Sequence, residues 1–464
     1  YRLWMLHNAV FRLTLGRKIS SPILFTTVCL FQIKQMVEIN DGRHFENPYQ
    51  DYVPGNQLKV ANTNIPNKLV ELLHVLNSNF EKLSSSDISM YTGLSGVGLF
   101  YYFLSHSTCE LLDKQIRGNA TECLEKLLHR CLRHIDMKTL RKNISVFTSP
   151  IGPLCLGALS AVKHGTENAE AKKFLEQILS ASNYALDVDS GMPDEALYGR
   201  TGYLNCLVTL KEHNFDIPVS IVSSVTDAVL KSGQRTASVY KSNNYYNTLI
   251  GHSSKRDLCM PPLMFEWHEK CYLGGAHGFA GILTTLLKVY HLFPGSISST
   301  SLDQLILPTV DWMSQLQLPK GNWPSSLGDS LSRDVLVHWC HGATGVIPLM
   351  LSAYKITGEN KYLKCALDGG ETLWTRGLLH KGCGLCHGSA GSGFALLEIY
   401  QTTQDPKYLY RAMKFAEWCT DCFKNATRVA DRPYSLMEGL SGTLYFLVGI
   451  LDPVNAKFPL LSGL

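Results

Sequence analysis

Apolar residues recur at spacings of three and four along the chain from residue 65 onward, as Leu69, Leu72 and Leu76 illustrate. This spacing places them on one face of an α-helix. Strict alternation of apolar and polar residues, which marks a half-buried β-strand, is scarce in the same region. The pattern therefore predicts an all-α protein.

A pair of glycines separated by two residues recurs along the chain, and each pair leads directly into an apolar stretch. The six complete pairs are Gly93 and Gly96, Gly199 and Gly202, Gly278 and Gly281, Gly342 and Gly345, Gly388 and Gly391, and Gly439 and Gly442. A seventh copy, Ser149 and Gly152, has lost its first glycine. A single pair is ordinary punctuation between helices, but seven copies in the same position before a helix indicate an internal repeat.

The helices predicted around the glycine pairs are of two kinds. Those that follow a pair, such as residues 97–104 and 346–354, are apolar on all sides, whereas intervening ones, such as residues 407–423, are amphipathic. Helices that are apolar all round are buried, and one-faced helices cover them. The sequence thus predicts an α/α toroid, a double-layered barrel of seven inner and seven outer helices, with all the glycine loops on one face. The longest gap between copies holds polar segments at 241–246 and 255–257, which we expect to form a surface loop near the entrance.

The composition is that of a large globular domain, since 45% of the 464 residues are hydrophobic and 18% are charged. No linker interrupts the repeat, so we predict one toroid domain over residues 36–464. Residues 1–35 are expected to be an N-terminal extension whose presence in the mature chain the sequence leaves open, with Met36 as an alternative start. The net charge of +4 is not concentrated in runs, which argues against a nucleic-acid partner. The fourteen cysteines are scattered rather than arranged as a disulfide framework, which favours the cytoplasm.

Cysteine and histidine stand side by side directly before two of the glycine pairs, as Cys340-His341 and Cys386-His387. Two thiols and an adjacent imidazole form the ligand set of a tetrahedral zinc site, and three protein ligands leave one position open for water or a substrate. The spacing is not that of a zinc finger, so the fold must bring the two loops together. Such a zinc ion either activates water or binds and deprotonates a thiol; thiolate ligands make the zinc less electrophilic and favour the thiol.

His277 precedes the fourth glycine pair in the position that His341 and His387 occupy before the fifth and sixth pairs. Equal positions in a ring imply equal heights, so His277 should face the same central cavity. We predict that His277 is a general acid or base, with a hydrogen-bonded structural histidine as the alternative. For His338 and His341, a place in the lining of the pocket is the favoured interpretation.

Three motifs together resemble those of the lanthionine synthetase C-like (LanC-like) family: Gly275-Ala276-His277-Gly278, His338-Trp339-Cys340-His341-Gly342 and Gly384-Leu385-Cys386-His387-Gly388-Ser389-Ala390-Gly391. The eukaryotic members are more similar to this chain than the bacterial lantibiotic cyclases, and the similarity extends from about residue 45 to about residue 459. The resemblance implies that Cys340, Cys386 and His387 are the zinc ligands and that His277 is the catalytic histidine.

The resemblance also implies residues for the substrates. The bacterial cyclases have an aspartate before the third glycine pair, and Glu195 matches its position here. Tyr198 and Arg200 are alternatives for the residue that takes over the role of this aspartate. The absence of the aspartate puts peptide cyclisation in question. Eukaryotic members bind glutathione, whose two carboxylates and one ammonium call for cations and a carboxylate on the protein. The matching positions here are Arg43, Lys381, Arg428 and Asp431.

The implied activity is a zinc-dependent addition of the glutathione thiolate to dehydroalanine or dehydrobutyrine residues in proteins or peptides, with one Zn²⁺ per chain. The first alternative is a non-catalytic signalling adaptor that binds glutathione and zinc. The second is a glycan-processing toroid enzyme, which needs two carboxylates facing the cavity, whereas Glu438 is the clearest acid beside a glycine pair. The family also leaves open a peripheral association with the plasma membrane.

Overall fold

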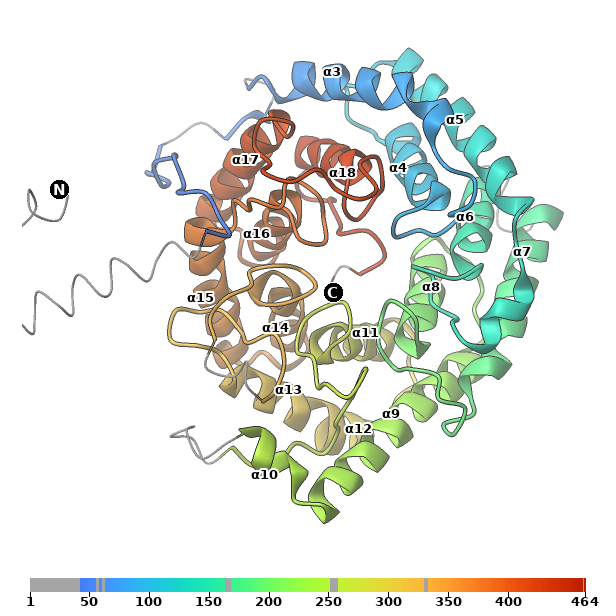
Figure 1. The fold of residues 1–464 in the computed structure, drawn as a ribbon, viewed down its shortest axis with the longest axis vertical. Helices are drawn as coiled ribbons and strands as arrows, with labels where there is room; N and C mark the ends of the chain where they lie inside the picture. The colour runs from blue at the N-terminus through green and yellow to red at the C-terminus, as the bar shows by residue number, and fades with distance from the viewer. Residues whose placement is uncertain are drawn as a thin grey trace, which may run out of the picture. The chain divides into compact units, whose positions relative to one another are not determined.

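The helices of the described residues are arranged in two layers around a central axis (Figure 1). This computed structural model describes residues 42–55, 58–60, 63–162, 168–250, 258–328, 333–461 and 463–464. One compact unit covers Arg43–Leu464, and the boundary predicted at residue 36 lies outside the described residues. In this part of the chain, pairing between extended segments is limited to three isolated bridges, so the predicted all-α class is confirmed.

The inner layer consists of the helices that follow the glycine pairs. Within the described ranges these are α4 (Leu94–His106), α6 (Ile151–Ala161), α8 (Arg200–Glu212), α11 (Phe279–Leu292), α14 (Ala343–Thr357), α16 (Ser389–Thr403) and α18 (Leu440–Leu451). Residues 343–353 of α14 are all buried, as expected for a helix that is apolar on every side. The seven inner helices match the seven glycine copies of the sequence.

The outer layer consists of helices with one buried face. Among the described residues these are α3 (Ile65–Ser78), α5 (Lys114–Leu132), α7 (Ala169–Ser180), α9 (Val219–Ser242), α13 (Leu307–Gln315), α15 (Asn360–Arg376) and α17 (Pro406–Thr420). Helix α7 shows the pattern: Ala171, Phe174 and Ile178 are buried, and the side chain of Asn168 caps its first turn. The predicted α/α toroid of seven inner and seven outer helices is therefore confirmed.

Short elements complete the described chain. They are η2 (Phe80–Lys82), η3 (Met137–Arg141), η5 (Ala181–Ala185), α10 (Tyr245–Ile250), α12 (Ser299–Ser301) and the π turn η6 (Leu302–Ile306). None of the helices in the described ranges is long and apolar enough to cross a membrane.

The loop predicted at 241–246 is limited to a turn of two exposed residues, Asn243 and Asn244. Helix α9 continues to Ser242, and α10 begins at Tyr245. Lys241 and Ser242 belong to the exposed side of α9. Tyr240 and Tyr246 are buried, and the hydroxyl of Tyr246 accepts a hydrogen bond from Trp312 Nε1 at 2.8 Å. The other predicted loop segment, residues 255–257, lies outside the described residues.

The second glycine of each pair allows the start of an inner helix to touch the loop that precedes it. A Cβ atom at Gly345 would overlap the carbonyl oxygen of Trp339, six residues earlier. The same six-residue contact occurs at the second glycine of every copy: Gly96 with Met90, Gly152 with Val146, Gly202 with Ala196, Gly281 with Gly275, Gly391 with Leu385 and Gly442 with Leu436. The repeat in the sequence thus records a repeated close approach of two backbones.

The seven glycine loops are joined to one another by a closed circle of backbone hydrogen bonds. The donors and acceptors are Tyr91 N to Phe147 O (2.9 Å), Ile144 N to Tyr198 O (3.2 Å), Ala196 N to Ala276 O (3.1 Å), Gly275 N to Trp339 O (3.0 Å), Trp339 N to Cys386 O (2.9 Å), Cys386 N to Met437 O (2.8 Å) and Met437 N to Tyr91 O (3.1 Å). Each bond links neighbouring loops, so residues in equivalent positions before the glycines are held at the same height around the axis.

We expect Gly345→Ala to destabilise the protein by about 2–3 kcal/mol, because the new methyl group forces the Trp339 carbonyl away from its bond with Gly275. The matched control is Gly118→Ala in the middle of α5, where nothing lies within 4 Å of the position of a Cβ. This control should stabilise the helix by about 0.5–1 kcal/mol. Urea unfolding of both variants checks the pair, and equal effects would contradict the close-approach explanation.

Candidate metal centre and active site

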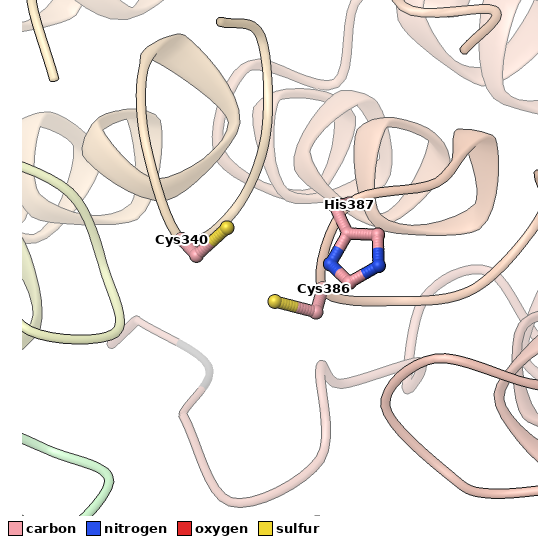
Figure 2. Close-up of side chains that lie close together, drawn as sticks. All are labelled: Cys340, Cys386 and His387. Atoms are coloured by element: carbon pink, nitrogen blue, oxygen red, sulfur yellow. The ribbon is translucent and has the colours of Figure 1, made fainter. Parts of the chain in front are cut away.

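The predicted metal ligands come together at the mouth of the ring. One ligand atom each from Cys340, Cys386 and His387 lie within 4.8 Å of one another. Figure 2 shows the two sulfur atoms and the imidazole facing a common space. Cys340 lies in the loop before α14, and the other two lie in the loop before α16, joined by the bond from Trp339 N to Cys386 O. The convergence of two loops that the sequence required is therefore present.

The donor set fits zinc. In a tetrahedral site with Zn–S bonds of about 2.3 Å and Zn–N bonds of about 2.0 Å, the two sulfurs are about 3.8 Å apart and each lies about 3.5 Å from the nitrogen. The spacing of Cys340, Cys386 and His387 needs small side-chain rotations to reach this geometry. Burial, and then the neighbouring Cys340 thiol, raise the pKa of Cys386 well above its usual value. A divalent cation would supply the charge that stabilises both thiolates, which explains why two thiols and an imidazole are gathered here.

Tyr91 also contacts this centre, although the cysteine and histidine motifs of the sequence did not indicate it. Its hydroxyl donates a hydrogen bond to Cys386 Sγ at 2.8 Å. Tyr91 stands two residues before Gly93, the same position that Cys340 and Cys386 hold before their own glycine pairs. That shared position in the repeat was the sequence signal that could have identified it.

We expect Tyr91→Phe to weaken zinc binding by about tenfold to a hundredfold, the effect of removing a hydrogen bond that orients a metal ligand. Competition with a chromogenic chelator measures this affinity. The control is Tyr272→Phe, whose ring lies near His341 but whose hydroxyl does not contact a ligand sulfur among the described residues. An unchanged affinity in Tyr91→Phe would show that the hydrogen bond does not support the centre.

His277 and Glu195 form an oriented pair. His277 Nδ1 lies 2.8 Å from Glu195 Oε2. The carboxylate is 2% exposed and also accepts hydrogen bonds from the backbone N of Leu197 (2.8 Å) and of Tyr198 (2.7 Å). A carboxylate fixed in this way orients the imidazole and leaves Nε2 as the nitrogen that can exchange a proton with a substrate.

Tyr198 and Arg200, the two other predicted site residues of this loop, have different surroundings. The ring of Tyr198 is 37% exposed and stacks nearly parallel to His277, with the centroids 6.1 Å apart. Arg200 is fully buried. Its guanidinium is held by the carbonyl oxygens of Ala185, Asp187 and Met192 and by the carboxylate of Asp194. Tyr198 therefore borders the site, whereas Arg200 lies in the scaffold beneath it and fastens the loop.

His338 and His341 line the same region. The ring of His338 lies 6.0 Å from that of His387, and the ring of His341 lies 5.5 Å from that of Tyr272. Burial, and then the charge of Lys381, lower the pKa of His338 well below its usual range. Burial, and then His277, lower the pKa of His341 to about 4. Both histidines therefore lie beside the candidate site.

The segments that carry the predicted glutathione contacts lie side by side. His380 N donates to Arg43 O at 3.0 Å, and Thr427 N donates to His380 O at 2.9 Å. These bonds place the backbone at Arg43, the loop of Lys381 and the segment leading to Arg428 next to one another. Arg428 forms an exposed ion pair with Asp431, at 3.0 Å.

Comparison with known sequences decides the family. The sequence model described as "Lanthionine synthetase C-like protein" matches residues 84–462. The chain belongs to the lanthionine synthetase C-like family. This confirms the resemblance carried by the glycine, cysteine and histidine motifs.

The LanC-like chain is 35% identical, over 439 residues, to the Danio rerio protein named "Glutathione S-transferase LANCL1", covering 91% of this chain and 99% of that protein. It also resembles the solved structure of nisin cyclase, with a TM-score of 0.56 and 16% sequence identity, over 83% of this chain and 94% of that one. At this identity the likeness to nisin cyclase shows a shared fold, in agreement with the toroid seen here.

Proposed function

We propose that this LanC-like protein catalyses the zinc-dependent addition of glutathione to dehydroalanine or dehydrobutyrine residues of proteins or peptides. The observation that carries the proposal is the convergence of Cys340, Cys386 and His387 at the mouth of a ring that also presents the His277–Glu195 pair. The relative that is named a glutathione S-transferase supports glutathione as the thiol.

The metal would be held by Cys340, Cys386 and His387, with the Tyr91 hydroxyl supporting the Cys386 sulfur. A bound Zn²⁺ with one open position supplies a site for a thiol sulfur and lowers the pKa of that thiol. These three residues would hold the metal, and the backbone hydrogen bonds between neighbouring loops fix the positions of the loops that carry them.

His277 would supply the proton that completes the addition. When the thiol loses its proton, the sulfur forms a bond to the β-carbon, and the electrons of the carbon–carbon double bond move onto the α-carbon and its carbonyl group. Transfer of one proton to the α-carbon then restores the saturated residue. The Nε2 of His277 is suited to this transfer because Glu195 fixes Nδ1.

The charged segments at the rim match the charges of glutathione. Arg43 and Lys381 would bind its carboxylates, and the exposed Arg428–Asp431 pair offers both a cation and a carboxylate for the opposite end of the tripeptide. A cytoplasmic location and a peripheral membrane association stay predictions.

The non-catalytic adaptor makes a different prediction about the thiol. In an adaptor, bound glutathione has no need to reach the metal ligands or His277.

A glycan-processing enzyme would need a pair of carboxylates facing the cavity. The Glu195 carboxylate is already bonded to His277 and to two backbone amides, so it is an unsuitable member of such a pair.

The proposal is tested by incubating the zinc-loaded protein with glutathione and a dehydroalanine peptide. We expect mass spectrometry to show a peptide carrying one glutathione, formed faster than in the reaction without protein. A rate equal to the uncatalysed one, together with tight glutathione binding, would favour the adaptor.

A further inference from the structure

A tight turn before the fourth glycine loop carries an unusual backbone. Trp267 and Lys270 exchange two backbone hydrogen bonds, of 2.9 and 3.1 Å, and enclose His268 and Glu269. Both enclosed residues have a positive φ, 47° and 59°, the conformation in which hairpin turns favour asparagine and glycine. Neither residue is of that kind, so the turn is maintained at a cost in backbone energy. Such strain is concentrated at functional sites in proteins.

The turn presents the indole of Trp267 beside His277. Three rings are nearly parallel there: Tyr198 and Trp267 have centroids 5.5 Å apart, Trp267 and His277 6.0 Å, and Tyr198 and His277 6.1 Å. We call Tyr198, Trp267 and His277 the aromatic face. It is open to solvent in part, since Tyr198 is 37% exposed, the His277 side chain is 22% exposed and Trp267 is half-buried.

Rings continue from the aromatic face toward the metal ligands. Tyr272 lies 6.0 Å from His277 and 5.5 Å from His341, measured between ring centroids. His341 is the residue after Cys340. The rings of Tyr272 and His341 therefore connect the aromatic face with the metal centre. A molecule bound to the aromatic face would lie beside the imidazole of His277.

Two polar groups of the aromatic face are available to a ligand. They are the hydroxyl of Tyr198, a residue that is 37% exposed, and Nε1 of Trp267, which is half-buried. Each can donate to a carbonyl oxygen while its ring contacts an apolar surface. The exposed residues next to Trp267 have both signs of charge, in Glu266, Glu269 and Lys270, so the surroundings do not select a strongly charged ligand. Flat aromatic surface with a few donors is suited to a peptide.

We propose that the aromatic face binds the acceptor peptide, an extended segment whose residues beside the dehydroamino acid pack against the rings of Tyr198 and Trp267. This inference rests on the proposed function. The dehydroamino-acid residue itself then lies at the Nε2 edge of His277 and crosswise to that ring, because Nε2 donates its proton in the ring plane and the α-carbon accepts it perpendicular to the plane of the double bond. The carbonyl groups of the peptide accept hydrogen bonds from Tyr198 and Trp267. In this position the α-carbon faces His277, and the β-carbon faces the path toward Cys340.

Binding is tested with the zinc-loaded full chain and a short fluorescein-labelled peptide that has dehydroalanine at its centre, without any thiol. We expect Trp267→Leu to raise the Kd from fluorescence anisotropy about fivefold to tenfold, and Trp267→Phe, which keeps a flat ring, to raise it less than about threefold. The same peptide with alanine in place of dehydroalanine should lose affinity to a similar degree with Trp267→Leu, because the indole contacts the residues beside that position. Equal affinities of the native protein and Trp267→Leu would overturn the proposal.

Kinetics separate a binding role of Trp267 from a role in holding His277. For Trp267→Leu we expect a higher KM for the acceptor peptide, with the KM for glutathione and the zinc content unchanged. A fall in kcat with an unchanged acceptor KM would mean that Trp267 only positions the imidazole, and would contradict the proposal. The control variant His268→Asn with Glu269→Gly keeps the turn and the indole, and should retain the native acceptor KM.

The anisotropy measurement does not depend on turnover. If the native protein forms no glutathione adduct, the proposed function fails whatever the peptide affinity is. If the adduct forms and Trp267→Leu leaves both the Kd and the acceptor KM unchanged, the acceptor site alone fails.

Discussion

Replacement of Cys386 by alanine is expected to remove zinc and lower the rate of glutathione addition by about a thousandfold, because the loss of metal-ion catalysis removes several kcal/mol of transition-state stabilisation. Cys386 is buried, and its sulfur lies beside Cys340 and His387 and accepts the hydrogen bond of Tyr91. Two remaining ligands do not hold zinc against competing chelators. Metal analysis and the adduct assay measure the two effects on the same sample.

The control is Cys383→Ala, three residues earlier in the same loop. Cys383 is also buried, but its sulfur is not among the atoms that converge at the centre. We expect this variant to retain one zinc per chain and most of the activity. Zinc retained by Cys386→Ala, or lost equally from both variants, would show that the motif cysteines have another role.

Replacement of His277 by glutamine is expected to lower kcat by about a hundredfold to ten-thousandfold, the usual contribution of a positioned acid or base. Zinc content and glutathione binding should be unchanged, because His277 is not one of the converging ligands. The adduct assay at saturating concentrations of both substrates measures this loss.

Glu195→Gln separates orientation from proton transfer. The carboxylate of Glu195 accepts hydrogen bonds from two backbone amides and pairs with His277. Glutamine keeps one acceptor oxygen for the pair with His277 but has no negative charge. We expect a smaller fall in kcat than for His277→Gln, and a double variant no slower than His277→Gln alone, because both residues act through one imidazole. Additive losses would mean that Glu195 acts on the substrate independently.

The architecture could be predicted because its cause lies in single residues. Each inner helix begins where a glycine lets two backbones touch, and this requirement recurs at positions such as Gly96, Gly345 and Gly442. The inner helices around these glycines are apolar because they are buried on all sides, and the outer helices are amphipathic because they are buried on one side. The loop predicted at 241–246 was too long for a related reason: the exposed end of an outer helix has the same polar composition as the turn that follows it.

The convergence of Cys340, Cys386 and His387 could be predicted because thiols and imidazoles before glycine pairs are a distinctive combination. Tyr91 was missed because a tyrosine is common in protein cores, and its contact with Cys386 Sγ depends on two loops 295 residues apart. For Arg200, which the family resemblance offers as an alternative to Glu195, the sequence did not reveal the surroundings of the side chain. Its burial follows from the carbonyl oxygens of the surrounding loop, whose positions no sequence pattern reveals.

The central claim is that two distant loops hold a zinc ion with one position that accepts the sulfur of glutathione. X-ray absorption at the zinc edge, with and without glutathione, tests it most directly. We expect two sulfurs at about 2.3 Å and at least one nitrogen in the protein alone, and a third sulfur after glutathione is added. A coordination shell without sulfur, or one that glutathione leaves unchanged, would contradict the claim.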